Sequence, residues 1–366
     1  MISVPFCQKY TCLNCFLYVC QTDRRTITAF RTYYRDYSYV FEAYIINLTF
    51  IVSHSSLNIA FSPIYLLVTL YSSFIMATIA KTIVATGATS GLGFELVKQL
   101  LAQTQPYKFI LGARDAKTAQ AAFDGLKYDS RHNLTIFPLE LSNLKTVKTF
   151  SQLVLEKLGQ DKIDYLLLNA AIAKNAEEPG PHGSKWSEPY IVNHLSQHYL
   201  THLLREKLEA SRSRIVVVSS GAVRGVEDPS FLDNDVKGAS KTERSVYSAT
   251  KFIQLLGAHW WRRQLQGKCD VVAVSPGLIP GTGLPRGTTM QLPISHPDAK
   301  TVPEGAQSIL RAFTRDDFPE DPDQIFLTSW GEWWPKDVYK LSLDKNLQDK
   351  WSPSKDEIEK EEGLTA

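Results

Sequence analysis

The chain has 366 residues, of which 44% are hydrophobic and 21% charged, and its formal net charge is +2 at pH 7. These values are typical of a globular protein with a full hydrophobic core, and they exclude a mostly disordered chain, a collagen-like repeat and a multi-span membrane protein. The balance of 40 basic and 38 acidic residues gives no footprint for a nucleic-acid partner, and five cysteines are too few for a disulfide scaffold.

Residues 1–75 differ in composition from the rest of the chain. None of the 20 glycines precedes Gly87, and residues 43–80 contain no Asp, Glu, Lys or Arg. Since folded domains use glycine in turns and helix ends, we predict an N-terminal extension outside the core. Two interpretations stay open: these residues are not part of the native protein, which then starts at Met76, or residues 61–80 anchor it in a membrane.

Four cysteines lie in this extension, at Cys7, Cys12, Cys15 and Cys20. A zinc site usually has two close pairs with a longer gap between them, and this spacing lacks that gap. A secretory signal is not indicated either, because its apolar stretch would lie nearer the start of the chain. We therefore assign neither a metal site nor an export signal to these residues.

From Lys81 onward, apolar runs typical of buried strands alternate with stretches typical of helices. The expected strands are Lys81–Thr86 and residues 107–112, 134–141, 163–171, 214–219, 269–275 and 324–328. Helices are expected after the first strand through residue 103, around 188–208 and over 245–266. This order predicts one α/β domain over residues 76–345, a doubly wound Rossmann-like parallel sheet with helices on both faces. Residues 346–366 are assigned to a charged C-terminal tail, of which about the last 12 residues are expected to be solvated.

A glycine-rich turn follows the first strand and opens a helix, as a dinucleotide site requires. Gly87 permits the tight turn, Gly91 lets the backbone approach a pyrophosphate, and Gly93 lets the helix pack close to the sheet. The positive end of the helix dipole favours the pyrophosphate charge. Ser90 and Leu92 belong to the same turn.

Five further motifs follow the glycine turn in order along the chain. They are Asn169-Ala170-Ala171, Asn193 in Val-Asn-His-Leu, Ser219-Ser220, the Tyr-x3-Lys pair Tyr247 and Lys251, and Pro276-Gly277. The whole set resembles the short-chain dehydrogenase/reductase family. The long segment between the serines and the tyrosine, with Thr282-Gly283-Leu284, is similar to the branch of retinol dehydrogenases, WW-domain oxidoreductases and protochlorophyllide reductases.

This resemblance implies an NAD(P)-dependent oxidoreductase that moves a hydride between nicotinamide and a carbonyl or alcohol. It assigns catalysis to Asn193, Ser220, Tyr247 and Lys251. It assigns cofactor contacts to Gly87, Ser90, Gly91, Leu92, Gly93, Arg114, Glu140, Leu141, Asn169, Ala170, Tyr247, Lys251, Pro276, Gly277 and Thr282.

The catalytic residue types fit this chemistry. Tyr247 and Lys251 are four residues apart, so they share one helix face. A nearby ammonium favours the phenolate, so we expect Lys251 and the positive nicotinamide to lower the pKa of Tyr247, which then exchanges a proton with the substrate. Ser220 is expected to hold the substrate oxygen, and Asn193 to hold a water that connects Lys251 to solvent.

The cofactor preference depends on the end of the second strand. An acidic residue there would bind the 2′-hydroxyl of NAD, whereas Arg114 could pair with the 2′-phosphate of NADP. We therefore favour NADP, although Arg114 could instead pair with Asp115 on the surface, and Ser90 lies where many NADP-dependent members carry a basic residue. Glu140 and Ala171 replace the family's usual aspartate and glycine.

Three histidines, His194, His198 and His202, recur every four residues on one predicted helix. Histidines at this spacing can bind zinc, but no nearby glutamate completes a hydrolase motif, so no metal is assigned. Trp330, Trp333 and Trp334 are interpreted as core or subunit packing rather than as a substrate stack.

The predicted partner is a small molecule. The segment after Gly277 is expected to form a mobile lid whose apolar residues are Leu284, Met290 and Leu292. We therefore expect a medium-sized, hydrophobic carbonyl or alcohol as the substrate. The chain is expected to be cytoplasmic, or membrane-associated if residues 61–80 are an anchor. A homo-oligomer is left open. An alternative function is a non-catalytic NADP-binding sensor or scaffold, although such a protein has no need of Ser220, Tyr247 and Lys251.

Overall fold

The computed structural model describes residues 6–12, 15–22, 25–31, 79–176, 180–237, 243–284, 295–296 and 298–364, and it divides into two units, Met1–Thr69 and Leu70–Ala366. The first unit contains an antiparallel sheet in the order β1-β2-β3, formed by β1 (Phe6–Cys12), β2 (Cys15–Thr22) and β3 (Arg25–Arg31). Most of residues 61–80, the candidate anchor, lie outside the described residues. Within the described part of the chain, no helix combines the length and the apolar character needed to cross a membrane.

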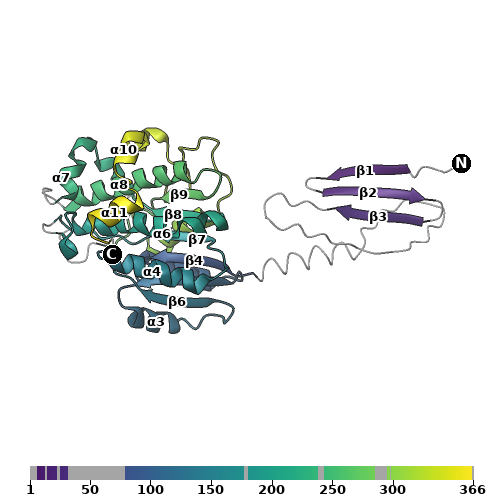
Figure 1. Ribbon diagram of the computed structural model, residues 1–366, viewed down its shortest axis with the longest axis horizontal. Coiled ribbons are helices and arrows are strands. Elements are labelled where there is room, and N and C mark those ends of the chain that lie inside the picture. The colour runs from purple at the N-terminus through teal and green to yellow at the C-terminus, as the bar shows by residue number, and fades with distance from the viewer. Residues whose placement is uncertain are drawn as a thin grey trace. The chain divides into compact units, whose positions relative to one another are not determined.

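The second unit contains a seven-stranded parallel sheet in the order β10-β9-β8-β7-β4-β5-β6 (Figure 1). Its strands are β4 (Lys81–Thr86), β5 (Tyr107–Ala113), β6 (Asn133–Pro138), β7 (Tyr165–Leu168), β8 (Arg214–Val218), β9 (Asp270–Val274) and β10 (Phe326–Leu327). β4 pairs with β5 on one side and with β7 on the other, so the strand order reverses at β4. This confirms the predicted doubly wound sheet and places its ligand-binding crevice at the carboxyl ends of these strands.

Helices cover both faces because the strands are apolar on both faces. Val84 and Ile110 pack with the core under α4 (Leu144–Leu158), α6 (Ser196–Ser211) and α8 (Glu243–Gln264). Ile83 and Phe109 pack with the opposite core, under α2 (Gly91–Leu101), α3 (Ala116–Asp124) and α9 (Val302–Thr314). Further short elements are η1 (Pro181–Gly183), η3 (Gly221–Gly225), η4 (Pro229–Phe231), α7 (Leu232–Val236) and η5 (Lys336–Leu343).

The helix predicted around residues 188–208 is interrupted. It consists of α5 (Glu188–Tyr190), a π-helical turn η2 (Ile191–Leu195) and then α6. A π turn leaves helix carbonyls without their regular partners, and such turns occur often at functional sites. Asn193 lies in the middle of this turn.

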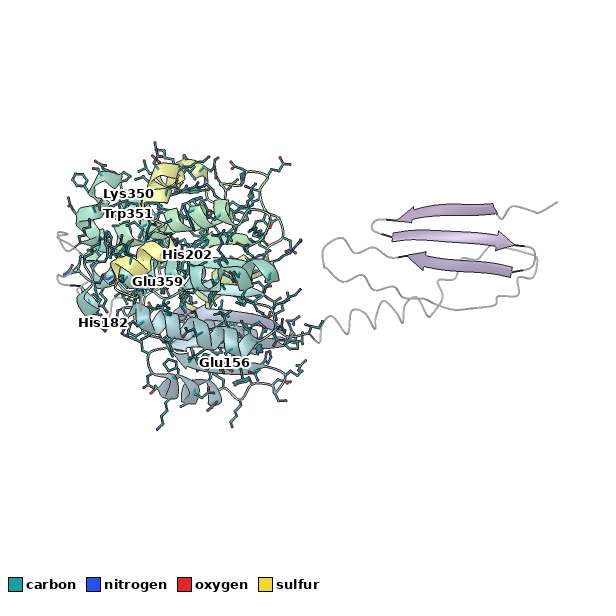
Figure 2. All side chains as sticks on the ribbon, viewed as in Figure 1. Glu156, His182, His202, Lys350, Trp351 and Glu359 are labelled. Carbon is teal, nitrogen blue, oxygen red and sulfur yellow. The ribbon has the colours of Figure 1, made fainter. Side chains whose placement is uncertain are left out.

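The C-terminal residues are folded onto the domain, so the predicted solvated tail is wrong. Helices α10 (Lys345–Lys350) and α11 (Lys355–Glu361) follow η5, and Trp351 and Ile358 are only 2% and 1% exposed. Figure 2 labels Trp351 and Glu359, which belong to this segment. The charges of α11 find partners there: the Tyr199 hydroxyl donates to Glu359 at 2.7 Å, and Lys148 forms an ion pair with Glu359 at 3.4 Å.

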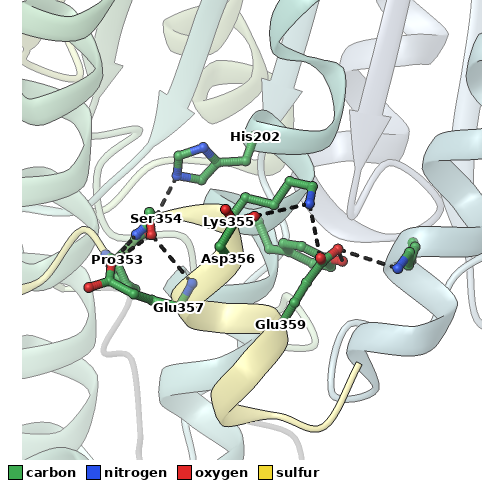
Figure 3. A network of polar contacts seen from close by, with 9 residues as sticks. His202, Pro353, Ser354, Lys355, Asp356, Glu357 and Glu359 are labelled. Atoms are coloured by element: carbon green, nitrogen blue, oxygen red, sulfur yellow. Dashed lines mark hydrogen bonds and ion pairs between the residues drawn. The ribbon is translucent and has the colours of Figure 1, made fainter. Parts of the chain in front are cut away.

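The three regularly spaced histidines hold this C-terminal segment. Ring nitrogens of His194 and His198 lie 2.8 Å and 2.9 Å from the carbonyl oxygens of Trp351 and Pro353, and His202 also reaches Pro353, at 3.2 Å (Figure 3). The Trp261 indole donates to the second nitrogen of His198 at 2.9 Å. His198 must therefore accept at Nδ1 and donate from Nε2, which is the neutral form. Packing of the C-terminal segment accounts for the repeat.

Candidate active site

A cavity of about 640 Å³ lies where β4, β5, β7, β8 and β9 end. Residues that directly follow these strands line it: Gly87, Arg114, Asn169, Ser219 and Ser275. The cavity brings together nearly all the predicted site residues, namely Gly87, Ser90, Gly91, Leu92, Arg114, Glu140, Leu141, Asn169, Ala170, Ser220, Tyr247, Lys251, Pro276, Gly277 and Thr282. Gly93 and Asn193 do not line it.

The glycine turn forms a tight backbone cradle at the start of α2. Gly87 has a φ of +62°, and a Cβ placed on it would lie 2.6 Å from the Cα of Ala170. Gly93 lies beneath the turn, where a Cβ would collide with the carbonyl oxygen of Gly87. A larger residue at Gly87 or Gly93 would therefore push α2 away from the end of β7. Ser90, the N-cap residue of α2, makes no side-chain capping bond, so the helix N-terminus faces the cavity with its amides available for an anion.

Hydrogen bonds from Asn169 hold the glycine turn in place, and Gln197 on α6 connects this turn to the end of β7. The Asn169 amide donates to the carbonyl of Gly87 at 2.7 Å, and the backbone amide of Asn169 donates to the Thr86 hydroxyl at 3.1 Å. That hydroxyl in turn donates to Gln197 at 2.8 Å. The Gln197 amide nitrogen donates to the carbonyls of Ala170 and Asn193 at 3.0 Å and 3.1 Å. One buried side chain thus joins β4, β7 and the π turn.

Asn193 is fully buried, and its amide is engaged by the protein. It accepts from the backbone amide of Ile172 at 2.8 Å and donates to the carbonyl of Ile172 and to the Thr250 hydroxyl, both at 2.9 Å. Both amide hydrogens are therefore used in joining the segment after β7 to α8. The expected water relay through Asn193 stays a prediction, and it would need another atom of this residue.

Ser220 and Tyr247 both line the cavity. Ser220 is the N-cap of η3, and its hydroxyl accepts from the backbone amide of Ala222 at 3.1 Å. Burial raises the pKa of Tyr247 to about 12, although the hydrogen bond with Ser220 acts in the opposite direction. Ser219 turns away and donates to the backbone carbonyl of Lys251 at 3.3 Å.

Lys251 is only 2% exposed, and burial lowers its pKa to about 7. Its ammonium donates to the carbonyl of Val218 and to the side-chain oxygen of Gln254, both at 2.6 Å. The expectation that Lys251 and the positive nicotinamide together lower the pKa of Tyr247 stays a prediction; within the chain alone, burial of the phenol outweighs the hydrogen bond from Ser220 and raises that pKa. A phenol with a raised pKa keeps its proton at neutral pH but is a weaker acid, because a general acid works best when its pKa lies near the operating pH.

Gln254 and Gln197 were not among the residues predicted from the sequence. Gln254 lies one turn after Lys251 on α8 and is 4% exposed, and its amide nitrogen has no hydrogen-bond partner among the described residues. The only available signal was a glutamine at helical spacing from a motif residue, which by itself does not distinguish a site residue from a surface one.

Arg114 and Glu140 lie at the part of the cavity expected to hold the adenosine. Arg114 is exposed at the end of β5. Asp115 caps α3 and accepts from the backbone amide and hydroxyl of Thr118, at 3.0 Å and 2.5 Å, so it is engaged within its own helix turn. Glu140 accepts from the backbone amide of Ser142 at 3.1 Å. Arg114 thus has its planar donors available at the rim.

The opposite wall is formed by the segment after β9. Gly277 has a φ of +92° and starts this segment, and Thr282 lies 3.7 Å from the position of a Cβ on Gly91. The backbone amide of Ala173 donates to the carbonyl of Leu284 at 3.2 Å, which joins the two walls. Of the predicted apolar lid, Leu284 lines the cavity, whereas Met290 and Leu292 lie outside the described residues.

The family and the fold can be compared directly with known proteins. The short chain dehydrogenase family model matches residues 81–291, more than half of the chain. The chain belongs to the short-chain dehydrogenase/reductase family. The predicted family is therefore confirmed, and the matched segment contains every predicted site residue.

Sequence relatives lie in the predicted branch. A short-chain dehydrogenase/reductase from Pestalotiopsis microspora, GME11359, is 62% identical over 288 residues, covering 77% of this chain and 99% of that protein. Human retinol dehydrogenases 13 and 14 are each 30% identical over 202 and 215 residues; each match covers 54% of this chain, and 59% and 62% of those proteins. The chain therefore spans about 60% of the length of these retinol dehydrogenases.

Solved structures show the same fold. NADPH-bound carbonyl reductase from chicken fatty liver has a TM-score of 0.53 at 22% identity, covering 70% of this chain and 94% of that chain. A short-chain dehydrogenase from Sphingobium yanoikuyae in complex with NADPH has a TM-score of 0.52 at 19% identity, covering 68% and 87%. At these identities, the likeness establishes the fold.

Proposed function

We propose that this oxidoreductase uses NADP to interconvert a carbonyl group and an alcohol on a medium-sized, largely hydrophobic molecule. The observation that carries the proposal is that Ser220, Tyr247 and Lys251 line the same cavity as the glycine turn. Nicotinamide supplies the hydride when it is bound. The chain's own residues would then handle the proton and the orientation of the substrate.

The residues present fit such a cofactor. The backbone of the glycine turn is packed so closely at Gly87 and Gly93 that a Cβ there would clash with its neighbours. The N-terminus of α2 provides donors for a pyrophosphate. Arg114 would pair with a 2′-phosphate. Two of the solved structures with this fold are bound to NADPH, which supports the same choice.

In the direction of reduction, Tyr247 would donate its proton to the carbonyl oxygen, while the Ser220 hydroxyl donates a hydrogen bond to that oxygen. Lys251, held by Val218 and Gln254, would contribute positive charge beside the phenol after it loses its proton. Ile172, Val192, Ile279 and Leu284 provide apolar lining, which supports a hydrophobic substrate.

The test is a panel of aldehydes, ketones and alcohols assayed through the absorbance of NADPH, alongside NADH. Turnover with NADPH, lost on substitution of Tyr247, would support the proposal. Tight NADPH binding with no turnover across the panel would instead favour the sensor or scaffold function.

A further inference from the structure

Arg224 is an exposed arginine of η3 that lines the cavity near Ser220. Its Nε donates to the carbonyl of Gly221 at 3.0 Å, and its guanidinium carbon lies 5.2 Å from the centroid of the Trp334 ring. A Cβ on Gly221 would lie 3.2 Å from an Nη atom of Arg224. Since Gly221 directly follows Ser220, the guanidinium lies against the backbone next to the serine expected to hold the substrate oxygen.

The charge of Arg224 is not neutralised within the cavity. No carboxylate among the described residues forms an ion pair with it, and the acidic residues of the lining are engaged elsewhere. Glu188 is paired with Lys174 at 2.7 Å, Glu140 accepts from Ser142, and Asp298 accepts from the Ser329 hydroxyl at 3.0 Å. The Arg224 guanidinium carries five N–H donors, of which the bond to Gly221 uses one.

This arrangement suits an anionic oxygen group better than a neutral one. A planar guanidinium forms paired, charge-assisted hydrogen bonds with a carboxylate. Stacking on Trp334 and the bond to Gly221 already restrict the side chain, so less rotamer freedom is lost when a ligand binds.

We propose that Arg224 is a specificity-determining residue and that the substrate is a carbonyl or alcohol that carries a carboxylate on an otherwise apolar body. This inference depends on the proposed function and narrows its substrate class. The carboxylate pairs with Arg224, and the apolar body contacts the lining formed by residues such as Val192 and Leu284.

The experiment compares matched acids and esters. 3-Formylbenzoate and 4-formylbenzoate are assayed with NADPH beside their methyl esters, in the parent chain and in Arg224→Gln. We expect the parent to prefer an acid over its ester by about tenfold or more in kcat/KM, and Arg224→Gln to lose that preference mainly through a higher KM for the acid. Arg224→Lys keeps the charge without the fork and should retain part of the preference.

Arg131→Gln is the matched control, because it removes the same charge from an exposed arginine that pairs with Asp129 and does not line the cavity. It should leave the acid-to-ester ratio unchanged. Equal activity on acids and esters in the parent, or a preference that persists in Arg224→Gln, would overturn the inference while leaving the oxidoreductase function intact.

A calorimetric titration separates the two proposals further. 4-(Hydroxymethyl)benzoate and its methyl ester are titrated into the NADP-bound chain, which needs no turnover. Tighter binding of the acid in the parent but not in Arg224→Gln supports the carboxylate site even if no aldehyde is reduced. Equal binding of acid and ester contradicts it.

Discussion

At the residue scale, Tyr247 is the group on which turnover should depend most. Burial raises its pKa, so the phenol is protonated at neutral pH and holds the proton that a carbonyl oxygen would receive. Tyr247→Phe removes that proton and little else, so we predict a fall in kcat of about 10²- to 10⁴-fold with an unchanged Kd for NADPH. Steady-state kinetics and cofactor titration give the two numbers. Tyr128→Phe, outside the cavity lining, is the control, and activity within a few-fold of the parent in Tyr247→Phe would exclude the donor role.

Gln254 should set the charge state of Lys251. Its oxygen accepts from the ammonium at 2.6 Å, and an acceptor favours the charged form of a lysine. In Gln254→Met we therefore expect the Lys251 pKa to fall below its value of about 7. If the charged lysine supports reduction, activity would then be lost at a lower pH than in the parent.

The pH profile of kcat/KM checks this, with Gln254→Glu expected to move the same limb to higher pH. Gln264→Met, on the exposed end of α8, should leave the profile unchanged. The Gln254 amide nitrogen has no partner among the described residues, so an apolar replacement removes an unsatisfied group and should be tolerated by the fold. Identical pH profiles in all variants would show that Gln254 does not act through Lys251.

Arg114 is expected to set the choice between the two nicotinamide cofactors. We predict that Arg114→Asp shifts the preference from NADP toward NAD, because a charged hydrogen bond to the 2′-phosphate is lost and a carboxylate takes its place, together worth a few kcal/mol. The ratio of kcat/KM for NADPH and NADH measures the shift. An unchanged ratio would place the phosphate contact on another residue.

Most of the candidate site residues could be predicted from the sequence, because most of the motifs follow a strand and the sheet brings the strand ends together. Gln197 and Gln254 could not be predicted in this way. Their roles arise from hydrogen bonds across 111 positions to Thr86 and across one helical turn to Lys251, and nothing in their own sequence neighbourhood indicates those partners.

At the element scale, the apolar runs predicted the strands along the chain and their parallel, doubly wound sheet. They did not predict the C-terminal helices. Charged sequences such as residues 355–361 are usually solvated. Here the carboxylates have partners far away in sequence. Glu359 contacts Tyr199 and Lys148 (Figure 3), and the Ser184 hydroxyl donates to Glu362 at 2.9 Å. The two apolar residues Ile358 and Leu364 supply the buried side of this segment.

The docking of this segment should weaken as pH falls. Burial lowers the pKa of His194 and of His202 to about 4 in the fold, against about 6.5 when unfolded. Both are then neutral in the fold, and the unfolded chain takes up more protons below pH 6.5. Stability is therefore complete above pH 6.5 and lost progressively toward pH 4, by about 3 kcal/mol for each histidine.

Urea unfolding at pH 7 and pH 5 measures this loss. The carboxylate of Glu359, whose pKa is lowered to about 2 chiefly by the hydrogen bond from Tyr199, loses its contribution only below about pH 4.5, so it contributes little to the change between pH 7 and pH 5. His194→Gln can keep the bond to Trp351 and should lose less stability between the two pH values than the parent. His182→Asn, at an exposed position with a φ of +56°, should behave as the parent, and equal losses in every variant would contradict the histidine origin.

At the scale of the whole molecule, the chain divides at its composition break. All seven strands of the parallel sheet lie between Lys81 and Leu327, and the family model begins at residue 81. The match to the Pestalotiopsis microspora relative leaves about a quarter of this chain uncovered. The glycine-free composition of residues 1–75 indicated that this segment is separate from the core, but composition alone does not say what the segment does.

We predict that a chain beginning at Met76 is soluble and keeps the turnover of the full chain within about twofold. β4 begins only five residues later and is already flanked by β5 and β7, so no sheet edge or core face needs anything that precedes it. Residues 43–80 carry no charge, and an exposed apolar stretch of that length would invite association. Fractionation and assay of both chains decide the matter. An insoluble or inactive truncation would show that the extension contributes to folding, whereas a full chain found stably in membranes, with the truncation displaced from them, would favour the anchor.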